Sequence, residues 1–173
     1  MKANQFFEKF ALIADAPDAV ARMRDIVLAW AVQGKLVIQD PNDQPAIVTS
    51  DSPCDGPFFV PESWSWIHLA DLQPEFQNGA SSRGDKDGTP VVVVRLADID
   101  QRRVSLENPR SINISADQIA KYRLKCGDTL ITRVNGSADI VGTFIPIQES
   151  LDAIYCDHFI RMRIDQDRCF PAY

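Results

Sequence analysis

The sequence is poor in paired cysteines, in long apolar runs and in positive charge, and each shortage excludes a class of protein. Its four cysteines stand apart, without the close spacing that zinc sites and redox-active dithiols use. We therefore expect free thiols in a reducing cytoplasm. No apolar run approaches the length of a membrane-spanning helix, and the N-terminal residues carry acids within their apolar part, unlike a secretory signal.

The net charge of −6 argues against a free-standing DNA-binding protein, because non-specific DNA affinity comes from neutralising phosphates. The charge is uneven along the chain, however. Residues 95–133 hold eight basic and five acidic side chains, a local positive balance in a chain that is otherwise negative. A solvated mixed-charge surface is the ordinary explanation of such a segment, and a nucleic-acid contact is the alternative.

Enzymatic motifs are equally scarce. The sequence has no nucleophile elbow, no zinc-ligand spacing and no calcium-binding loop, and it lacks the glycine-rich loop and catalytic motif of a DNA methyltransferase. Cys156, Asp157 and His158 are adjacent, but neighbouring residues of a strand point to opposite faces. We expect no catalytic residues and no metal site. A small enzyme that uses Cys156 with His158, or His68, is kept as the rival interpretation.

The N-terminal part follows a helical period. Apolar residues at helical spacing predict a first helix before Pro17 and a second helix over residues 17–33, ended by Gly34. Prolines and acids then predict a linker over residues 39–60. We expect a helical segment over 1–38 and a β-rich domain over 61–173. The fold class is therefore α+β, with an N-terminal helical hairpin before a β-rich domain that contains short helices.

Alternating and β-branched residues predict the strands of that domain. The predicted strands cover residues 61–69, 90–99, 111–115, 130–134, 140–147, 154–155 and 159–164. Ser115 and Gln118 have the spacing of a capping box, which predicts a short helix directly after Ser115. The strands over 130–134 and 140–147 are expected to form a β-hairpin around the turn dipeptide Asn135-Gly136.

Polar side chains gather in two predicted loops. A guanidinium, an amide and a hydroxyl occur together on the hairpin loop, and a glycine-rich loop follows residue 76. Such groups suit base-edge and phosphate recognition, although a surface loop that binds nothing is the more common case. The candidate DNA-binding residues are Gln77, Asn78, Ser82, Arg83, Arg95, Arg133, Asn135 and Ser137.

Four passages, in this order, resemble the specificity (S) subunit of type I restriction–modification enzymes. They are residues 23–41 (MRDIVLAWAVQGKLVIQDP), 61–72 (PESWSWIHLADL), 88–99 (GTPVVVVRLADI) and 122–142 (YRLKCGDTLITRVNGSADIVG). The resemblance is to one conserved helical segment followed by one target recognition domain. The full subunit carries two such domains, so the chain is expected to be truncated or half-length, with possible self-dimerisation.

The resemblance implies a non-catalytic subunit that reads one half of a split double-stranded DNA target. It implies methyltransferase (M) and restriction (R) subunits as partners, with S-adenosylmethionine, Mg and ATP bound on those partners and no cofactor on this chain. The apolar stripe of the second helix supplies the candidate subunit contacts, which are Met23, Ile26, Val27 and Trp30. An interaction module or regulator that binds M subunits without reading DNA is the alternative.

Overall fold

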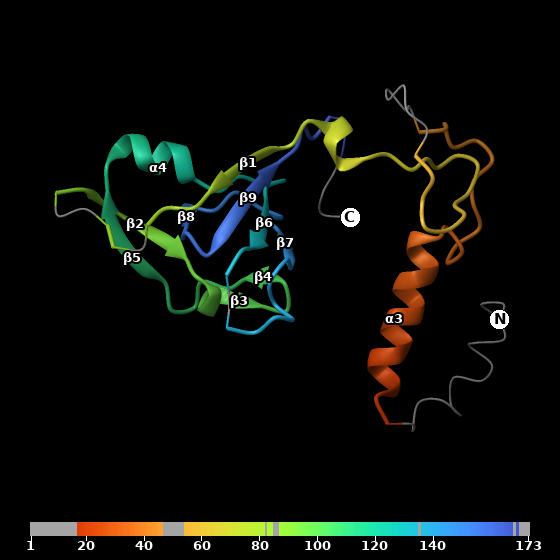
Figure 1. The fold of residues 1–173 in the computed structure, drawn as a ribbon, viewed down its shortest axis with the longest axis horizontal. Helices are drawn as coiled ribbons and strands as arrows, with labels where there is room; N and C mark the ends of the chain where they lie inside the picture. Colours follow the sequence, from red (N-terminus) through yellow and green to blue (C-terminus); the bar gives the residue numbers. More distant parts are fainter. Residues whose placement is uncertain are drawn as a thin grey trace. The chain divides into compact units, whose positions relative to one another are not determined.

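The computed structural model of this protein describes residues 17–46, 54–81, 83–84, 87–134, 136–167 and 169. The chain divides into two compact units, Met1–Asp71 and Leu72–Tyr173 (Figure 1). The limits expected from the sequence, with a linker over residues 39–60, stay a prediction. Among the described helices, none has the length and apolar character needed to cross a membrane.

Helix α3, Ala19–Val32, forms the regular part of the first unit. It confirms the second predicted helix, and it ends as expected at Gly34, whose φ of 64° is the left-handed conformation that glycine tolerates. The amides of Gly34 and Lys35 donate to Ala31 and Trp30, which satisfies two carbonyl groups of the last turn. The first predicted helix lies outside the described residues, so the helical hairpin is not confirmed.

The strand predicted over residues 61–69 is wrong. Pro61 opens a turn, in which the Trp64 amide donates to the Pro61 carbonyl, and a 3-10 helix covers Leu69–Leu72. Trp66 packs edge-on against Phe58, with 4.9 Å between ring centroids, and its indole nitrogen donates to the Phe58 carbonyl. This local pairing replaces the ladder of a strand.

The second unit contains three sheets (Figure 1). The four-stranded sheet is antiparallel, in the order β1 (Glu75–Asn78), β9 (Phe159–Arg163), β6 (Thr129–Thr132) and β7 (Phe144–Pro146). The three-stranded sheet has the order β5 (Arg110–Ile114), β2 (Thr89–Val94) and β8 (Ala153–Tyr155), with β2 and β8 parallel. The small sheet pairs β3 (Ile99–Asp100) with β4 (Arg103–Val104).

The predicted hairpin is confirmed as β6 and β7, although its strands are shorter and its connection longer than expected. The strand predicted over 90–99 ends at Val94, where a 3-10 helix, Leu96–Asp98, takes over. The capping box is confirmed: the Ser115 hydroxyl accepts from the Gln118 amide at the start of α4, Ala116–Tyr122. The mixed composition agrees with the predicted α+β class.

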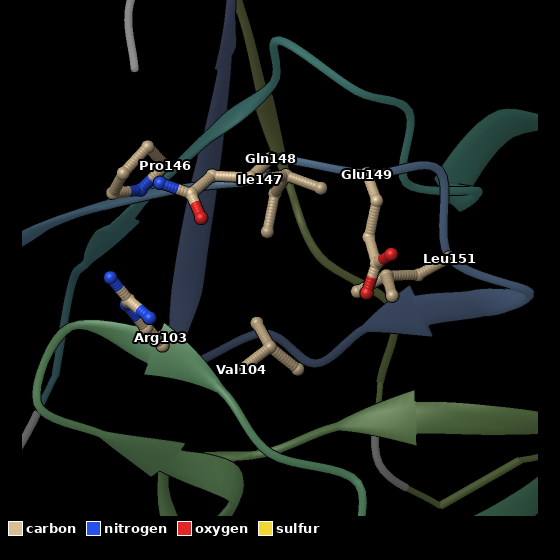
Figure 2. Close-up of a pocket in the computed structure, with 7 residues that line it drawn as sticks. All are labelled: Arg103, Val104, Pro146, Ile147, Gln148, Glu149 and Leu151. Carbon is tan, nitrogen blue, oxygen red and sulfur yellow. The ribbon is translucent and has the colours of Figure 1, made fainter. Parts of the chain in front are cut away.

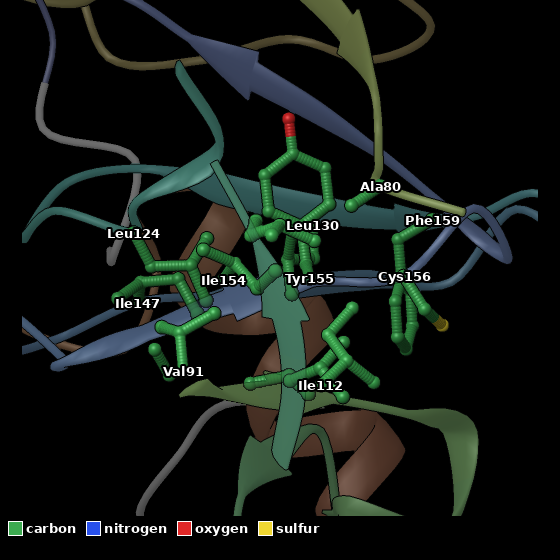
Figure 3. Packing of buried hydrophobic residues seen from close by; sticks show 14 of the residues in the cluster. Ala80, Val91, Ile112, Leu124, Leu130, Ile147, Ile154, Tyr155, Cys156 and Phe159 are labelled. Atoms are coloured by element: carbon green, nitrogen blue, oxygen red, sulfur yellow. The ribbon is translucent and has the colours of Figure 1, made fainter. Parts of the chain in front are cut away.

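One apolar core joins the four-stranded and three-stranded sheets, and Tyr155 and Phe159 are its largest fully buried side chains (Figure 3). Leu124, Leu130 and Ile154 complete its centre. The Tyr155 hydroxyl donates to the Gln77 carbonyl, so the buried phenol is satisfied. The core therefore fixes the end of β1 against the strand that leads into β9.

Candidate nucleic-acid interface

Three segments that are far apart in the sequence meet at one hollow of the second unit, with a volume of about 340 Å³. They are the loop after β1, the loop after β6 and the turn between β8 and β9. We call this site the Arg83–Arg133 hollow. The described residues that line it are Ser81, Arg83, Arg133, Val134, Asp157 and His158.

Backbone hydrogen bonds hold the three segments together. The Arg133 amide donates to the His158 carbonyl at 2.8 Å, which ties the loop after β6 to the turn. The Ala80 amide donates to the Tyr155 carbonyl at 2.9 Å, and the Gly79 amide donates to Phe159 at 3.1 Å. Because β1 and β6 both pair with β9, their ends arrive at this turn as a consequence of the sheet order.

Gly79 makes the approach of the β1 loop possible. A Cβ atom built on Gly79 would lie 2.1 Å from the Cys156 carbonyl oxygen and 2.7 Å from that of Tyr155. Side chains do not tolerate such distances from backbone atoms, so only glycine fits here.

The guanidinium groups of Arg83 and Arg133 have no hydrogen-bond or ion-pair partner within the described part of the chain, and both residues are exposed. Several other arginines of the same unit, by contrast, have side-chain partners. Arg163 binds the Asp128 carboxylate, and Arg161 donates to Gln77 and to the Lys121 carbonyl. The hollow thus presents two uncommitted guanidinium groups from two segments, an arrangement that suits base edges or phosphates.

The turn at Cys156, Asp157 and His158 corrects the expectation of side chains on opposite faces. Asp157 and His158 form a turn directly after the β-bridge of Cys156 with Ala80, and the possible ligand atoms of the three residues lie within 4.8 Å of one another. The Cys156 sulfur lies 3.4 Å from the His158 Nδ1 atom, and the Asp157 carboxylate lies 3.6 Å from the same nitrogen. Burial raises the pKa of the Cys156 thiol, which disfavours the thiolate that a nucleophile or a metal ligand needs.

The other predicted DNA-binding residues are placed differently. Gln77 is partly buried, and its amide oxygen accepts from Arg161 at 3.0 Å, whereas Asn78 is exposed at the end of β1. Arg95 forms a two-point contact with Asp98, through Nε at 2.9 Å and Nη2 at 2.7 Å. Ser137 is partly buried in the β6–β7 connection. Ser82 and Asn135 lie outside the described residues.

Four lining residues are missing from the predicted DNA-binding residues: Ser81, Val134, Asp157 and His158. Val134 has an apolar side chain, and Asp157 and His158 were interpreted as part of a strand. The turn is placed beside Arg83 and Arg133 by the pairing of both β1 and β6 with β9, which joins segments far apart in the chain. Sequence spacing alone does not contain that pairing.

Comparisons with known proteins identify relatives over most of the chain. It is 32% identical over 164 residues to the type I restriction enzyme StySPI specificity subunit of Salmonella potsdam, covering 94% of this chain and 32% of that protein. It is 26% identical over 159 residues to the EcoKI specificity subunit of Escherichia coli K12, covering 91% of this chain and 31% of that protein. No family model matches. The chain is homologous to type I specificity subunits.

This homology confirms the family predicted from the four sequence passages. A shorter match, 28% identical over 82 residues, is to the putative MjaX specificity subunit of Methanocaldococcus jannaschii, with 47% of this chain and 19% of that protein covered. The chain spans about a third of the length of the StySPI and EcoKI specificity subunits.

The predicted subunit contacts of this specificity-subunit homologue lie on α3. Met23, Ile26, Val27 and Trp30 are all partly buried there. Val20 and Leu28, by contrast, are 70% and 56% exposed. The helix therefore carries apolar surface on more than the predicted stripe.

A second hollow, of about 350 Å³, lies between β4 and the connection from β7 to β8 (Figure 2). Arg103 and Glu149 lie at its two ends, with Val104 and Ile147 between them. None of the predicted site residues lines it. Its two opposite charges give it no preference for anionic or cationic ligands.

Proposed function

We propose that the second unit reads DNA sequence, as the recognition part of a type I specificity subunit, and that it contacts one half of a split target. The observation that carries this proposal is the Arg83–Arg133 hollow, where two uncommitted guanidinium groups from separate segments face solvent together. Arginine can bind guanine through two hydrogen bonds, and each good pair contributes roughly 1–3 kcal/mol of discrimination.

The proposed role is recognition without catalysis. M and R subunits would carry out methyl transfer and cleavage, and they would bind S-adenosylmethionine, Mg and ATP. The acidic chain needs such partners, because a protein with a net charge of −6 gains little affinity from the phosphate backbone by itself. A cytoplasmic complex of this kind would place the hollow on DNA while the partner subunits supply phosphate contacts.

Helix α3 is proposed as the contact with M, or with a second copy of the chain if two half subunits pair. Its apolar residues are the support for this role: Met23, Ile26, Val27 and Trp30 are only partly buried, and Val20 and Leu28 are largely exposed. Burial of such surface favours association, at roughly 25 cal/mol for each Å² of apolar area.

The test is a selection from random-sequence duplex DNA, performed with the chain alone and with the M subunit of the same system. Enrichment of one short motif, sharpened by M, is the expected result. The variant Arg133→Ala should lose part of that motif, whereas Arg103→Ala, which removes an arginine from the other hollow, should keep it. M binding without any enriched motif would replace DNA reading with the alternative, an interaction module.

A further inference from the structure

We infer that Asp157 makes the Arg83–Arg133 hollow select a base that presents an exocyclic amino group in the major groove, which is cytosine or adenine. This inference rests on the proposed function and names what the site would recognise. It follows from the position of one carboxylate among two guanidinium groups. No sequence pattern pointed to Asp157 as a DNA-reading residue.

The position of Asp157 is defined by its neighbour in the turn. The His158 carbonyl accepts from the amides of Arg133 and Val134, at 2.8 and 3.4 Å. Residue 157 is therefore one peptide unit from the bonds that anchor the loop after β6. Its side chain is 49% exposed and lines the hollow. The carboxylate and the loop that carries Arg133 thus form adjacent walls of one site.

A carboxylate in this place opposes a phosphate ligand. An ionised carboxylate only accepts hydrogen bonds, and a phosphate diester also offers only acceptors together with a negative charge. A phosphate in the hollow would satisfy Arg83 and Arg133 while it repelled Asp157. Base edges present a better complement, because they carry donors beside acceptors.

In the major groove the donors are the amino groups of cytosine N4 and adenine N6. A carboxylate can accept from either one, while a neighbouring guanidinium donates to purine N7 or to guanine O6. The G·C pair offers all of these groups on one edge: two acceptors on guanine and the amino donor on cytosine. That edge therefore complements the hollow: Asp157 would accept from the cytosine amino group, and Arg133 or Arg83 would donate to guanine N7 and O6.

The contact with His158 does not explain why the chain has a carboxylate at position 157. The two groups are 3.6 Å apart and about half exposed, and exposed pairs of this kind contribute little to stability. Asp157 can turn toward a ligand without leaving a buried charge unpaired. The same exposure means that Asp157→Ala should fold, which a urea unfolding curve verifies before any DNA experiment.

The experiment compares motifs selected from random DNA, in the presence of M, by the wild-type protein, Asp157→Ala and the charge-matched control Glu149→Gln. We expect the wild type to require cytosine or adenine at one position. Asp157→Ala should lose about tenfold in discrimination at that position alone. Glu149→Gln, whose side chain lines the other hollow, should select the wild-type motif. An unchanged motif in Asp157→Ala, or an equal rise in affinity for all sequences, would overturn the inference.

A second measurement removes the amino group from the DNA instead of the carboxylate from the protein. Cytosine is replaced by 2-pyrimidinone, or adenine by purine, at the position that the selection identifies. The substitution should weaken wild-type binding about tenfold and leave Asp157→Ala unaffected. Equal weakening of both proteins would overturn the inference while the proposed function stands. If the wild type with M selects no motif, the proposed function fails, and the inference fails with it.

Discussion

Arg163 binds the buried carboxylate of Asp128 through two hydrogen bonds, from Nε to Oδ1 at 2.6 Å and from Nη2 to Oδ2 at 2.8 Å. Asp128 is only 1% exposed, and it also accepts from the Lys125 amide. The pair joins β9 to the turn that begins β6. Two of the strands that lead to the Arg83–Arg133 hollow, β6 and β9, are therefore joined by an ion pair at their far ends.

Replacement of Asp128 by Asn should destabilise the second unit, because it leaves the Arg163 guanidinium without its counter-charge. Since Arg163 is partly exposed, we expect a loss of about 2 kcal/mol, below the range for a fully buried pair. Urea unfolding at neutral pH measures the change. The control is Asp152→Asn, which breaks the exposed pair with Arg123 and should cost less than about 1 kcal/mol. Equal effects of the two variants would contradict the prediction.

The ion pair of Asp98 and Arg95 should make the free energy of unfolding depend on pH in the acidic range. Hydrogen bonds from Arg95 hold the pKa of Asp98 below its ordinary value of 3.8. A carboxyl whose pKa is lower in the folded state stabilises the protein above its unfolded pKa and loses that contribution as pH falls through the folded value. The pair should therefore stabilise at pH 7 and cease to do so as the pH falls below about 4.

The measurement for Asp98 is the urea midpoint of the wild type and of Asp98→Asn, at pH 7 and near pH 3. We expect the wild type to be more stable at pH 7 and the difference to shrink at the lower pH. All other acids are shared by the two proteins, so their contributions cancel in the comparison. A difference that stays constant between the two pH values would show that Asp98 acts without its charge.

Local signals in the sequence predicted much of the second unit. The capping box at Ser115 and the hairpin of β6 and β7 are confirmed because each depends on residues that are close in the chain. The strand predicted over 61–69 failed because alternating Trp64 and Trp66 resemble a half-buried strand, although Trp66 packs on Phe58 instead. Alternation reports which residues are apolar and does not report what they pack against.

The candidate site was predicted only in part, for a topological reason. Arg83 and Arg133 were named from their loops, but the turn that lies beside both was not, because its place depends on the pairing of β1 and β6 with β9. Arg95 shows the opposite effect. It was predicted to contact DNA, and the structure gives its guanidinium a carboxylate partner three residues away, Asp98.

Substitution by alanine should change stability differently at two glycines, one in the loop after β1 and one in the β6–β7 connection. Gly79→Ala forces a Cβ against the Cys156 carbonyl, so we expect a loss of about 2 kcal/mol and weaker DNA binding from a displaced β1 loop. Gly136→Ala meets no atom within 4 Å and has no left-handed φ, so its stability should be unchanged or slightly raised. Thermal or urea unfolding separates the two cases. A neutral Gly79→Ala would contradict the tight approach of β1 to the turn.

Substitution of Arg133 by two different residues should show whether it contacts a base or a phosphate. Arg133→Ala removes both charge and hydrogen bonds, so the affinity for the target should fall about tenfold. Arg133→Lys keeps the charge and loses the planar two-point donor. If Arg133 reads a base, the lysine variant should bind with an unchanged salt dependence but with about tenfold less discrimination at one position. A lysine variant that discriminates like the wild type, paired with an alanine variant whose salt slope falls by about one, would assign Arg133 to a phosphate.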